Sequence, residues 1–286
     1  MADQPPPLRI ALISPGAMGS ALGAALSAAG HTVLTSLTGR SAKSRARAEA
    51  AGMLDADDAT LAACDTILSV LPPGDAPALV ERLLPHIAAR AEKPLFVDAN
   101  ALSPATKTAL AARLATAGCT LVDGAILGPP PGTSPRGAVL LLSGAAAQDA
   151  TRLATVPCPT RIVGETVGGA SALKMCYGGI NKGVAGLAAA LLLAAERHGI
   201  ADALKAEMAE HMPDLFQRYQ RRIPDMMPKA YRWVAEMQEI SAFLAPDDAA
   251  GAEIYQGLAG VFATIAEDVA GDGKACAVLH RAIAAP

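Results

Sequence analysis

The stretch at residues 8–30, LRIALISPGAMGSALGAALSAAG, decides the fold. The apolar run 8–13 predicts a buried strand, residues 14–19 form a turn of small residues, and the alanine-rich segment that follows predicts a helix. Strand, glycine turn and helix in this order are typical of a dinucleotide-binding unit. Gly16 would let the backbone approach a pyrophosphate, and Gly19 would let helix and strand pack closely. The helix N-terminus would favour the anion.

The glycine motif in this turn is incomplete. Ser14 stands where the usual G-x-G-x-x-G has its first glycine, so an ordinary strand–helix turn is the alternative interpretation. The cofactor contacts predicted in the turn are Ser14, Pro15, Gly16, Ala17, Met18 and Gly19.

Composition limits the class of protein. The 286 residues are enough for two domains, and 52% hydrophobic with 18% charged residues is typical of a globular chain. The net charge of -3 gives no indication of a nucleic-acid or membrane-surface partner. The start, MADQPPP, has no apolar core, so residues 1–7 are expected to be disordered and not a signal peptide. The longest apolar helix candidate, 184–195, is too short to span a bilayer.

Cysteine usage points to a compartment. The five cysteines are scattered and have no metal-ligand spacing, so we expect no metal site. An odd number of scattered cysteines suggests reduced thiols, and we therefore expect a cytoplasmic protein.

Strand and helix signals alternate along the first half of the chain. Further strands are expected at 31–36, 65–71, 95–100, 120–127 and 138–143, with a helix over 76–91 that is interrupted near Pro85. From residue 168 the pattern is almost entirely helical, beginning with one long helix at 168–198 that ends before Gly199. The sequence predicts an α/β Rossmann domain with a doubly wound, mostly parallel sheet over 8–165, followed by an all-α domain over 166–286.

Residues after the second expected strand indicate which cofactor is used. No acidic residue stands where NAD would need one for its ribose 2′-hydroxyl. Arg40, with the hydroxyls of Thr38 and Ser41, suits a 2′-phosphate, which predicts NADP(H) over NAD(H). A solvated basic helix face is the alternative. The strand ends at Leu71, Pro72 and Asn100 are further cofactor candidates, although Asn100 could simply form a turn.

Lys174 is the catalytic candidate on the long helix. It lies in an apolar, small-residue segment, GGASALKMCYGG, where its charged form is disfavoured and proton exchange near neutral pH is easier. Tyr177 and Asn181 follow at i+3 and i+7 on the same face. A lysine that extends to solvent on a domain-linking helix is the alternative. The glycines at 178, 179, 183 and 186 predict that another helix, a partner subunit or the nicotinamide ring packs closely here.

Four motifs occur in order: PGAMG at 15–19, VDAN at 97–100, DGAILGPP at 123–130 and GGASALK at 168–174. With them the chain resembles the β-hydroxyacid dehydrogenase group, relatives of 6-phosphogluconate dehydrogenase. Residues 227–241 look like the helical C-terminal domain of a less characterised branch of that group. The resemblance implies an NAD(P)-binding Rossmann domain, Lys174 as catalytic acid/base, and a homodimer built through the helical domain.

Departures from the family pattern bear on the substrate. In the family motif D-x-P-V-S-G-G the serine and glycines hold a carboxylate, but here the proline, serine and second glycine fall on Ala125, Leu127 and Pro129. Asp123 and Gly128 remain. These changes suggest a substrate that is bulkier or less anionic than a small 3-hydroxy acid. The substrate contacts predicted are Asp123, Leu127, Gly128, Tyr177 and Arg232.

The C-terminal half adds three expectations. The family's asparagine after the lysine falls on Gly178, and Asn181 could present its amide to the same space. A surface ion pair between Arg232 and Glu236 is the alternative to a functional role for Arg232. Trp233 is expected in the core or an interface.

The sequence as a whole predicts an NADP-dependent oxidoreductase that moves hydride between nicotinamide and a hydroxy acid or carbonyl compound. Lys174 and Asn181 would be its catalytic residues. An imine reductase of the same architecture and a non-catalytic NADPH-binding sensor are the alternatives. The expected partners are a small-molecule substrate and a second copy of the chain.

Overall fold

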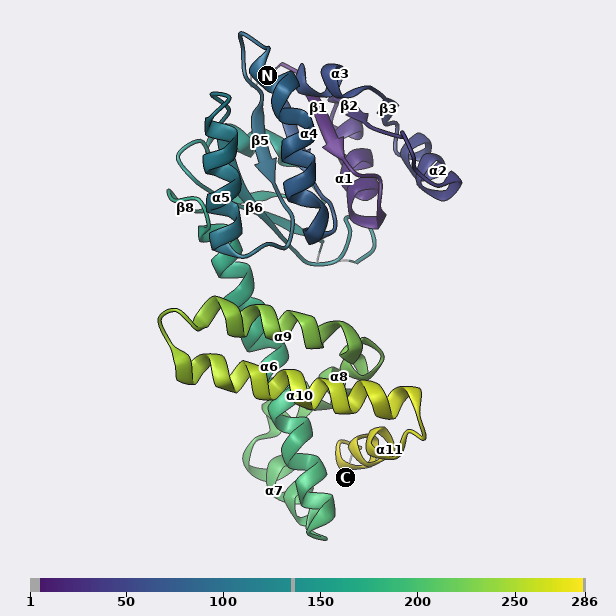
Figure 1. The fold of residues 1–286 in the computed structure, drawn as a ribbon. Helices are drawn as coiled ribbons and strands as arrows, with labels where there is room; N and C mark the ends of the chain where they lie inside the picture. The colour runs from purple at the N-terminus through teal and green to yellow at the C-terminus, as the bar shows by residue number, and fades with distance from the viewer. Residues whose placement is uncertain (1–5, 135–136, 285–286) are drawn as a thin grey trace. The chain divides into compact units, whose positions relative to one another are not determined.

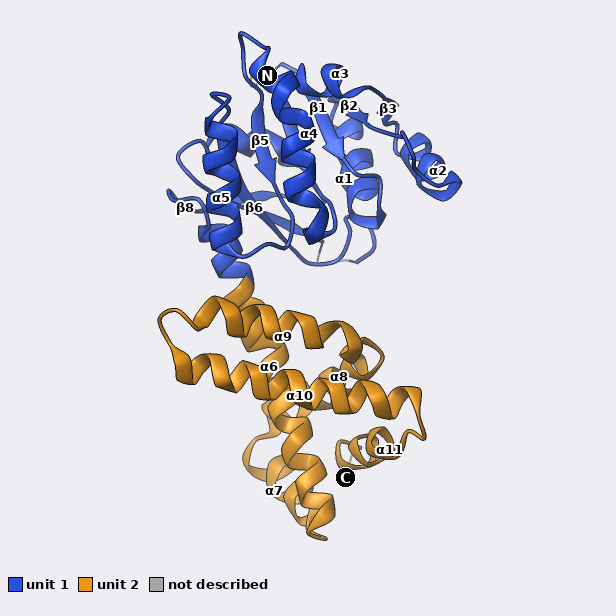
Figure 2. Ribbon diagram, viewed as in Figure 1, with its two compact units in different colours: residues 1–174 blue, residues 175–286 orange. Residues whose placement is uncertain are grey.

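The computed structural model describes residues 6–134 and 137–284, which form a strand-and-helix region followed by helices (Figure 1). The chain divides into two compact units, residues 1–174 and 175–286 (Figure 2). The disorder predicted for residues 1–7 falls mainly on 1–5, which lie outside the described residues.

Unit 1 contains an eight-stranded sheet with the order β3-β2-β1-β4-β5-β6-β7-β8. Among the described strands, β6 and β7 form the one antiparallel pair. The doubly wound, mostly parallel sheet is therefore confirmed. The strands are β1 (Arg9–Ile13), β2 (Thr32–Thr35), β3 (Leu54–Asp55), β4 (Thr66–Ser69), β5 (Leu95–Asp98), β6 (Leu121–Leu127), β7 (Val139–Ser143) and β8 (Thr160–Gly164).

Helices cover both faces of the sheet because successive strand side chains alternate between two cores. Ile10 and Leu12 join α1 and α2 in one core, whereas Ala11 and Ile13 join α3, α4 and α5 in the other. The helices of unit 1 are α1 (Ala17–Ala28), α2 (Ala42–Ala50), α3 (Asp58–Ala62), α4 (Ala76–Ala88) and α5 (Pro104–Ala115), with short 3₁₀ turns η1 (Pro73–Asp75) and η2 (Asp149–Leu153).

Two local predictions need correction. Pro85 does not interrupt α4, which continues to Ala88. Its ring lies on the exposed side, while Leu84 and Ile87 on either side stay buried against the sheet and hold the last turn in place. The edge strands β3 and β8 were not expected, because β3 has only two residues, both exposed, and β8 is half exposed.

The long helix α6 (Gly169–Arg197) begins at the end of unit 1 and continues into unit 2. Its predicted end is confirmed, since Gly199 follows with φ +68°. The other helices of unit 2 are α7 (Ala201–His211), α8 (Pro213–Met226), η3 (Met227–Lys229), α9 (Ala230–Leu244), α10 (Ala249–Ala270) and α11 (Lys274–Ala282).

The core of unit 2 explains three of the four glycines singled out on α6, namely 179, 183 and 186, whereas a Cβ on Gly178 would meet only Lys182 Nζ at 3.9 Å. A Cβ on Gly179 would lie 2.7 Å from Tyr255 Oη, and one on Gly186 would lie 2.8 Å from Leu258 Cδ2 and 2.9 Å from Phe262 Cζ. For these three glycines, the predicted packing of another helix is therefore confirmed, and that helix is α10. Trp233 is buried, as expected, and meets Phe262 edge-on with ring centroids 5.2 Å apart.

The apolar stretch 184–195, which was expected to be too short to span a bilayer, is part of the longer apolar helix α6, so that prediction needs correction. By length and composition alone, the 29 residues of α6 could cross a membrane, and in the described part of the chain no other helix meets that test. The most apolar part of α6 is 44% buried inside the protein. Its Ala185, Ala189 and Leu192 belong to the core of unit 2, so this part of α6 packs inside the helical unit.

Candidate cofactor and catalytic site

The turn between β1 and α1 is open at the N-terminus of α1. Gly16 is the N-cap of α1, and no side chain of the described residues caps this helix, whereas Ser41, Asp57 and Ser103 cap α2, α3 and α5. A Cβ on Gly16 would meet no described atom within 4 Å. The turn therefore offers open space beside free N–H groups, which fits an anionic group.

Gly19 has the packing role that the sequence predicts. A Cβ there would overlap the carbonyl oxygen of Ser14 and lie 3.2 Å from Leu12 Cδ2. Only a glycine lets α1 approach the end of β1 this closely. Of the other turn residues, Pro15 is buried, Ala17 is exposed, and Met18 packs against the core on the α1 side.

The loop after β2 is held in one shape by its neighbours. The Arg45 guanidinium donates to the carbonyl oxygens of Leu37 at 2.7 Å and Arg40 at 3.3 Å. The Leu37 N–H donates to Asp55 Oδ1 at 2.8 Å. Ser41 Oγ accepts from the N–H of Ser44 at 3.3 Å, so this hydroxyl serves as the cap of α2.

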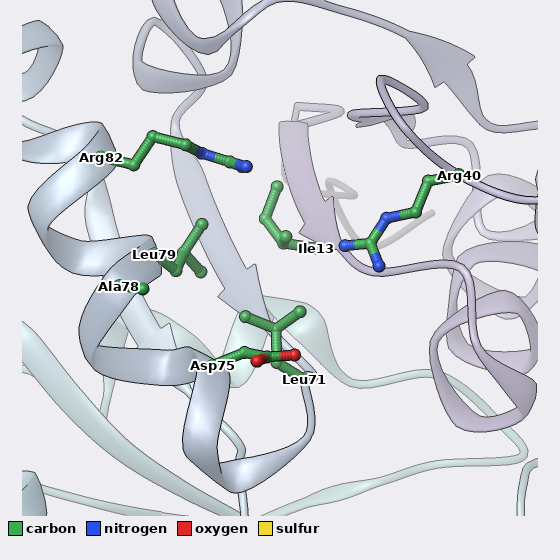
Figure 3. Close-up of a pocket in the computed structure, with 7 residues that line it drawn as sticks. All are labelled: Ile13, Arg40, Leu71, Asp75, Ala78, Leu79 and Arg82. Atoms are coloured by element: carbon green, nitrogen blue, oxygen red, sulfur yellow. The ribbon is translucent and has the colours of Figure 1, made fainter.

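A cavity of about 220 Å³ lies beside this loop, where β1 and β4 end (Figure 3). Such a crevice between the first strand and its crossover neighbour is where ligands of doubly wound sheets bind. The side chains of Arg40 and Arg82 point into it from opposite sides. Arg82 also pairs with Asp58 at 3.3 Å. The lining residues are Ile13, Arg40, Leu71, Asp75, Ala78, Leu79 and Arg82.

Sequence reasoning found Arg40 and Leu71 but missed Asp75 and Arg82. Asp75 ends η1 and Arg82 lies in the middle of α4, and no motif marks either residue. The one available signal concerned Asp75, which follows a strand end that borders the crevice. Pro72, the neighbouring prediction, is exposed and leads into η1.

Asn100 is 2% exposed, and its amide is fully engaged inside the protein. Its Oδ1 accepts from the N–H of Leu71, and its Nδ2 donates to Ser69 Oγ and Asp98 Oδ2, both at 2.7 Å. These bonds shape the end of β4, which lines the cavity. They support the turn-forming interpretation, and direct contact of Asn100 with a cofactor stays a prediction.

A buried ionic cluster lies where the carboxyl end of β5 pairs with the first half of β6. Lys107, Asp98 and Asp123 are all 0% exposed. Lys107 Nζ donates to the carboxylate and the carbonyl of Asp98 and to the Gly124 carbonyl at 3.1 Å, and it lies 3.3 Å from Asp123 Oδ1. No sequence pattern marks this cluster, since Lys107 is one of several polar residues on α5.

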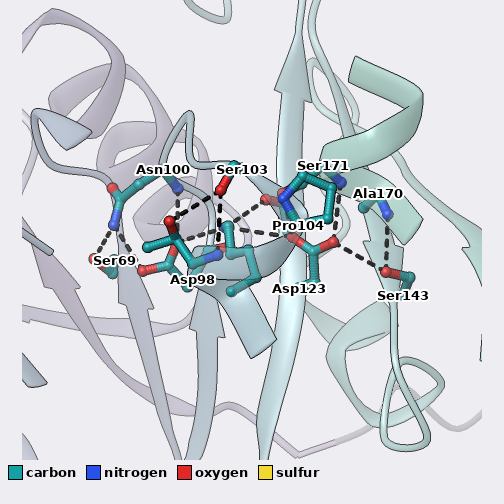
Figure 4. Close-up of polar contacts among 12 residues, drawn as sticks. Ser69, Asp98, Asn100, Ser103, Pro104, Asp123, Ser143, Ala170 and Ser171 are labelled. Atoms are coloured by element: carbon teal, nitrogen blue, oxygen red, sulfur yellow. Dashed lines mark hydrogen bonds and ion pairs between the residues drawn. The ribbon is translucent and has the colours of Figure 1, made fainter. Parts of the chain in front are cut away.

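Asp123 connects this cluster to the start of α6 (Figure 4). Its carboxylate accepts from Ser171 N–H at 2.9 Å, Ser171 Oγ at 2.7 Å and Ser143 Oγ at 3.2 Å. Ser143 Oγ in turn accepts from the Ala170 N–H at 2.8 Å. Full burial with these partners argues for a structural role of Asp123 rather than the predicted substrate contact. Lys174 follows one helical turn after Ser171 and is half-buried.

The remaining predicted substrate residues of unit 1 lie at the end of β6. Leu127 is half-buried beside Ala125 and Ala170. Gly128 has φ +105°, and a Cβ there would lie 2.5 Å from the Gly137 carbonyl oxygen. This glycine is therefore required by the turn itself.

The predicted residues of unit 2 are placed as follows. Tyr177 is 55% exposed. Asn181 Oδ1 accepts a bond from Arg218 Nη2 at 3.5 Å. The Arg232–Glu236 pair does not form, since Glu236 pairs with Lys182 and the Arg232 guanidinium lies 5.8 Å from the centre of the Tyr231 ring. No observation tests a catalytic role for Asn181, which stays a prediction.

Comparison with known families assigns both parts of the chain. Residues 9–156, more than half of the sequence, match the family described as the NAD binding domain of 6-phosphogluconate dehydrogenase. Residues 195–265 match a domain of unknown function, DUF1932. No curated protein sequence matches the chain.

Solved structures give the same fold over nearly the whole length. A conserved protein of unknown function, described as structurally similar to 3-hydroxyacid dehydrogenases, is 26% identical and covers 93% of this chain and 99% of its own, with a TM-score of 0.77. The 3-hydroxyisobutyrate dehydrogenase of Mycobacterium tuberculosis, solved with L-serine, is 20% identical over 96% of this chain and 99% of its own, with a TM-score of 0.69.

Imine reductases share the fold as well. The enzyme of Myxococcus stipitatus, solved with NADP⁺, is 23% identical over 98% of this chain and 100% of its own, with a TM-score of 0.53. A variant solved with NAD⁺ gives 0.59 at the same identity and coverage. Taken with the glycine turn and the cavity beside it, the family matches establish that this chain belongs to the β-hydroxyacid dehydrogenase group, with a 6-phosphogluconate-dehydrogenase-type NAD-binding domain and a DUF1932 helical domain.

Proposed function

We propose that the protein is an NADP-dependent oxidoreductase that acts on a hydroxy acid or carbonyl compound, with Lys174 as general acid/base. The observation that carries this proposal is the position of Lys174, one turn after a helix start that is bonded to the buried carboxylate of Asp123 on β6. When bound, the nicotinamide group supplies or accepts the hydride. The residues of the chain have to bind the cofactor, orient the substrate and move one proton.

Lys174 would move that proton at the substrate oxygen. In the direction of reduction its ammonium group donates a proton to the oxygen of the carbonyl, and in the direction of oxidation the neutral amine removes the proton from the alcohol. One amino group can therefore serve both directions, as the donor in its ammonium form and as the acceptor in its neutral form.

Arg40 is the basis for NADP(H) over NAD(H). Its side chain points into the cavity beside β1 and β4, and Arg45 holds the loop that carries it. A guanidinium can bind phosphate oxygens through two parallel hydrogen bonds and keeps its charge at any physiological pH. Arg82 adds a second cation across the cavity, and Thr38 is exposed in the same loop, so both could support a 2′-phosphate.

The substrate is proposed to be bulkier or less anionic than a small 3-hydroxy acid. Leu127 and Gly128 form the end of β6 where the family motif has a serine and a glycine. An apolar leucine side chain offers no hydrogen bond to a carboxylate, and it favours apolar surface on the substrate.

A homodimer through the helical unit is also proposed. Four large apolar side chains, at least half exposed, recur along α6 at intervals of three, seven and four residues. This spacing forms the stripe that two helices bury against each other. The stripe comprises Tyr177, Ile180, Leu187 and Leu191. A cytoplasmic location is proposed with it, because the buried thiols Cys64, Cys119 and Cys158 are free.

An imine reductase is the second candidate, supported by the shared fold of the solved imine reductases. Lys174 argues for the first candidate, since a carbonyl oxygen needs a proton donor of this kind. The experiment is to follow NADPH oxidation by the purified protein against 2- and 3-keto acids, ketones, aldehydes and cyclic imines. The Lys174→Ala variant is compared with the wild type in the same screen.

For a carbonyl substrate, we expect Lys174→Ala to lower kcat about 10²- to 10⁴-fold, the range of general acid–base catalysis. Lys274→Ala is the matched control, because this side chain is 84% exposed and pairs with Asp272 on the surface. Turnover of imines alone would establish the second candidate instead. Binding of NADPH without turnover of any compound would leave a sensor and overturn the proposal.

A further inference from the structure

We propose that Asp123 is a positioning residue, which fixes Lys174 by anchoring the first turn of α6 to the buried cluster of Lys107 and Asp98. This inference rests on the proposed function, because it assigns a role relative to the proton-transfer group. The role proposed for Asp123 is neither contact with the substrate nor packing in the core, but attachment of the helix that carries Lys174.

The start of α6 is held by residues distant in the sequence. Backbone N–H groups in the first turn of a helix have no partner within the helix. In α6, the N–H of Ala170 donates to Ser143 Oγ on β7, and that of Ser171 donates to Asp123 Oδ2 on β6. The carboxylate also meets the positive end of the helix dipole, which strengthens the attachment. The first turn is therefore bonded directly to the sheet.

Hydrogen bonds, rather than large apolar side chains, hold this turn in place. Its sequence, Gly-Ala-Ser-Ala at 169–172, offers little surface for packing. A Cβ on Gly169 would lie 3.3 Å from the Cβ and Oγ of Ser143, so the turn lies against β7. Removing the Asp123 bonds would free the turn to shift, and Lys174 would move with it.

Asp123 can anchor the helix because several partners hold its own side chain in place. Its carboxylate has no exposed surface and contacts Lys107 Nζ, which is itself bonded to Asp98 and to the Gly124 carbonyl. A fully satisfied buried network of this kind is rigid, since each member holds the next. Loss of one member would leave a buried charge unpaired, which is costly, so the arrangement is strongly held.

The network extends to the wall of the cavity. Asp98 Oδ2 accepts from Asn100 Nδ2, and Asn100 Oδ1 accepts from the N–H of Leu71, which lines the cavity together with Arg40. One hydrogen-bonded and ionic path therefore joins the proposed cofactor edge to the helix that carries Lys174. The path runs through Leu71, Asn100, Asp98, Lys107, Asp123 and Ser171.

Precise placement matters for proton transfer. A general acid must be within hydrogen-bond reach of the oxygen that it serves, and a displacement of about 1 Å can cost about 100-fold in rate. A shift in the first turn of α6 is passed along the helix to Lys174, three residues after Ser171.

The first test measures the anchor itself and needs no substrate. Asp123→Asn keeps the size of the side chain and leaves one lysine facing one aspartate, so the cluster stays charge-balanced and the variant is expected to fold. We expect hydrogen exchange at residues 170–174 to rise about tenfold or more, because two bonds from Ser171 to a carboxylate weaken. Ser171→Ala, which removes one of those bonds, should give a smaller rise.

The matched control is Asp57→Ala, which removes the aspartate that caps α3. It should raise exchange near residue 60 and leave residues 170–174 unchanged. Wild-type protection of 170–174 in Asp123→Asn would overturn the inference, whether or not a substrate is known.

The second test separates positioning from general weakening by a double-mutant cycle. In the wild-type background, Asp123→Asn should lower kcat about tenfold or more while the KM for substrate and the Kd for NADPH change less than about twofold. In the Lys174→Ala background, the same substitution should change kcat less than about twofold, because the group it positions is absent.

An equal loss in both backgrounds would overturn the inference and leave the proposed function standing. Wild-type turnover by Lys174→Ala alone would overturn the proposed function and the inference with it. The two failures are therefore distinguishable.

Discussion

Replacing Gly16 by alanine should damage cofactor binding without damaging the fold. A Cβ at Gly16 meets no described atom within 4 Å, and its φ of -71° is accessible to alanine. The free energy of unfolding should therefore stay the same or rise by up to about 1 kcal/mol, since alanine restricts the unfolded chain. The added methyl group would occupy the space that a pyrophosphate needs. Crowding of this kind costs about 1–3 kcal/mol, which corresponds to about 5- to 140-fold weaker NADPH binding.

Gly19→Ala is the contrasting variant. Its Cβ would overlap the Ser14 carbonyl oxygen, and backbone cannot move aside as a side chain can. We expect the free energy of unfolding to fall by about 1–3 kcal/mol or more. The assay is urea unfolding of both variants with calorimetric titration of NADPH. Wild-type affinity in Gly16→Ala, or a stability loss equal to that of Gly19→Ala, would refute the assignment of this turn to the pyrophosphate.

Three further predictions concern other parts of unit 1. Arg40→Ala should weaken NADPH binding about 10- to 100-fold, since hydrogen bonds to charged groups contribute about 1.5–3 kcal/mol. Calorimetry should show unchanged binding of NADH. Equal losses of affinity for both cofactors would contradict the role of Arg40 at the 2′-phosphate. Lys107→Met should lower the free energy of unfolding by about 3–5 kcal/mol, because Asp98 and Asp123 would be buried without their cation. Urea unfolding measures this loss, and a variant as stable as the wild type would disprove the ionic cluster. Burial raises the pKa of Cys64, Cys119 and Cys158 to about 11 from 9.0, so the unfolded chain loses these protons first, and the free energy of unfolding should fall as pH rises from about 9 to 11. In variants with serine at these positions, the free energy of unfolding should no longer fall over that pH range. A fall as steep as in the wild type would show that the thiols are not the cause.

Much of the fold could be predicted from the sequence because the relevant signals are local. The apolar run before Gly16, the close approach at Gly19 and the small residues of α6 each reflect one element and its immediate neighbour. Trp233 was expected in the core or an interface because a large aromatic side chain rarely stays exposed. The sequence order of strands and helices then limits the topology to a doubly wound sheet.

The candidate site was harder to predict because its contacts are non-local. Asp123 has the same appearance in the sequence whether it binds a substrate or anchors a helix, and its partner Ser171 lies 48 residues away. Arg82 faces Arg40 only because the sheet order places β4 between β1 and β5, which brings α4 to the crevice. The Arg232–Glu236 spacing allowed an ion pair, but Lys182 from α6 takes Glu236 instead. The spacing of residues along one helix does not show whether a cation from another helix will take the same carboxylate.

The most direct test of the central claim is a calorimetric titration of the purified protein with NADPH and, separately, with NADH. We expect saturable binding of both cofactors at the glycine turn, with NADPH bound about tenfold or more tightly through Arg40. Equal affinity would contradict the NADP preference. Binding of neither cofactor would contradict the oxidoreductase assignment itself.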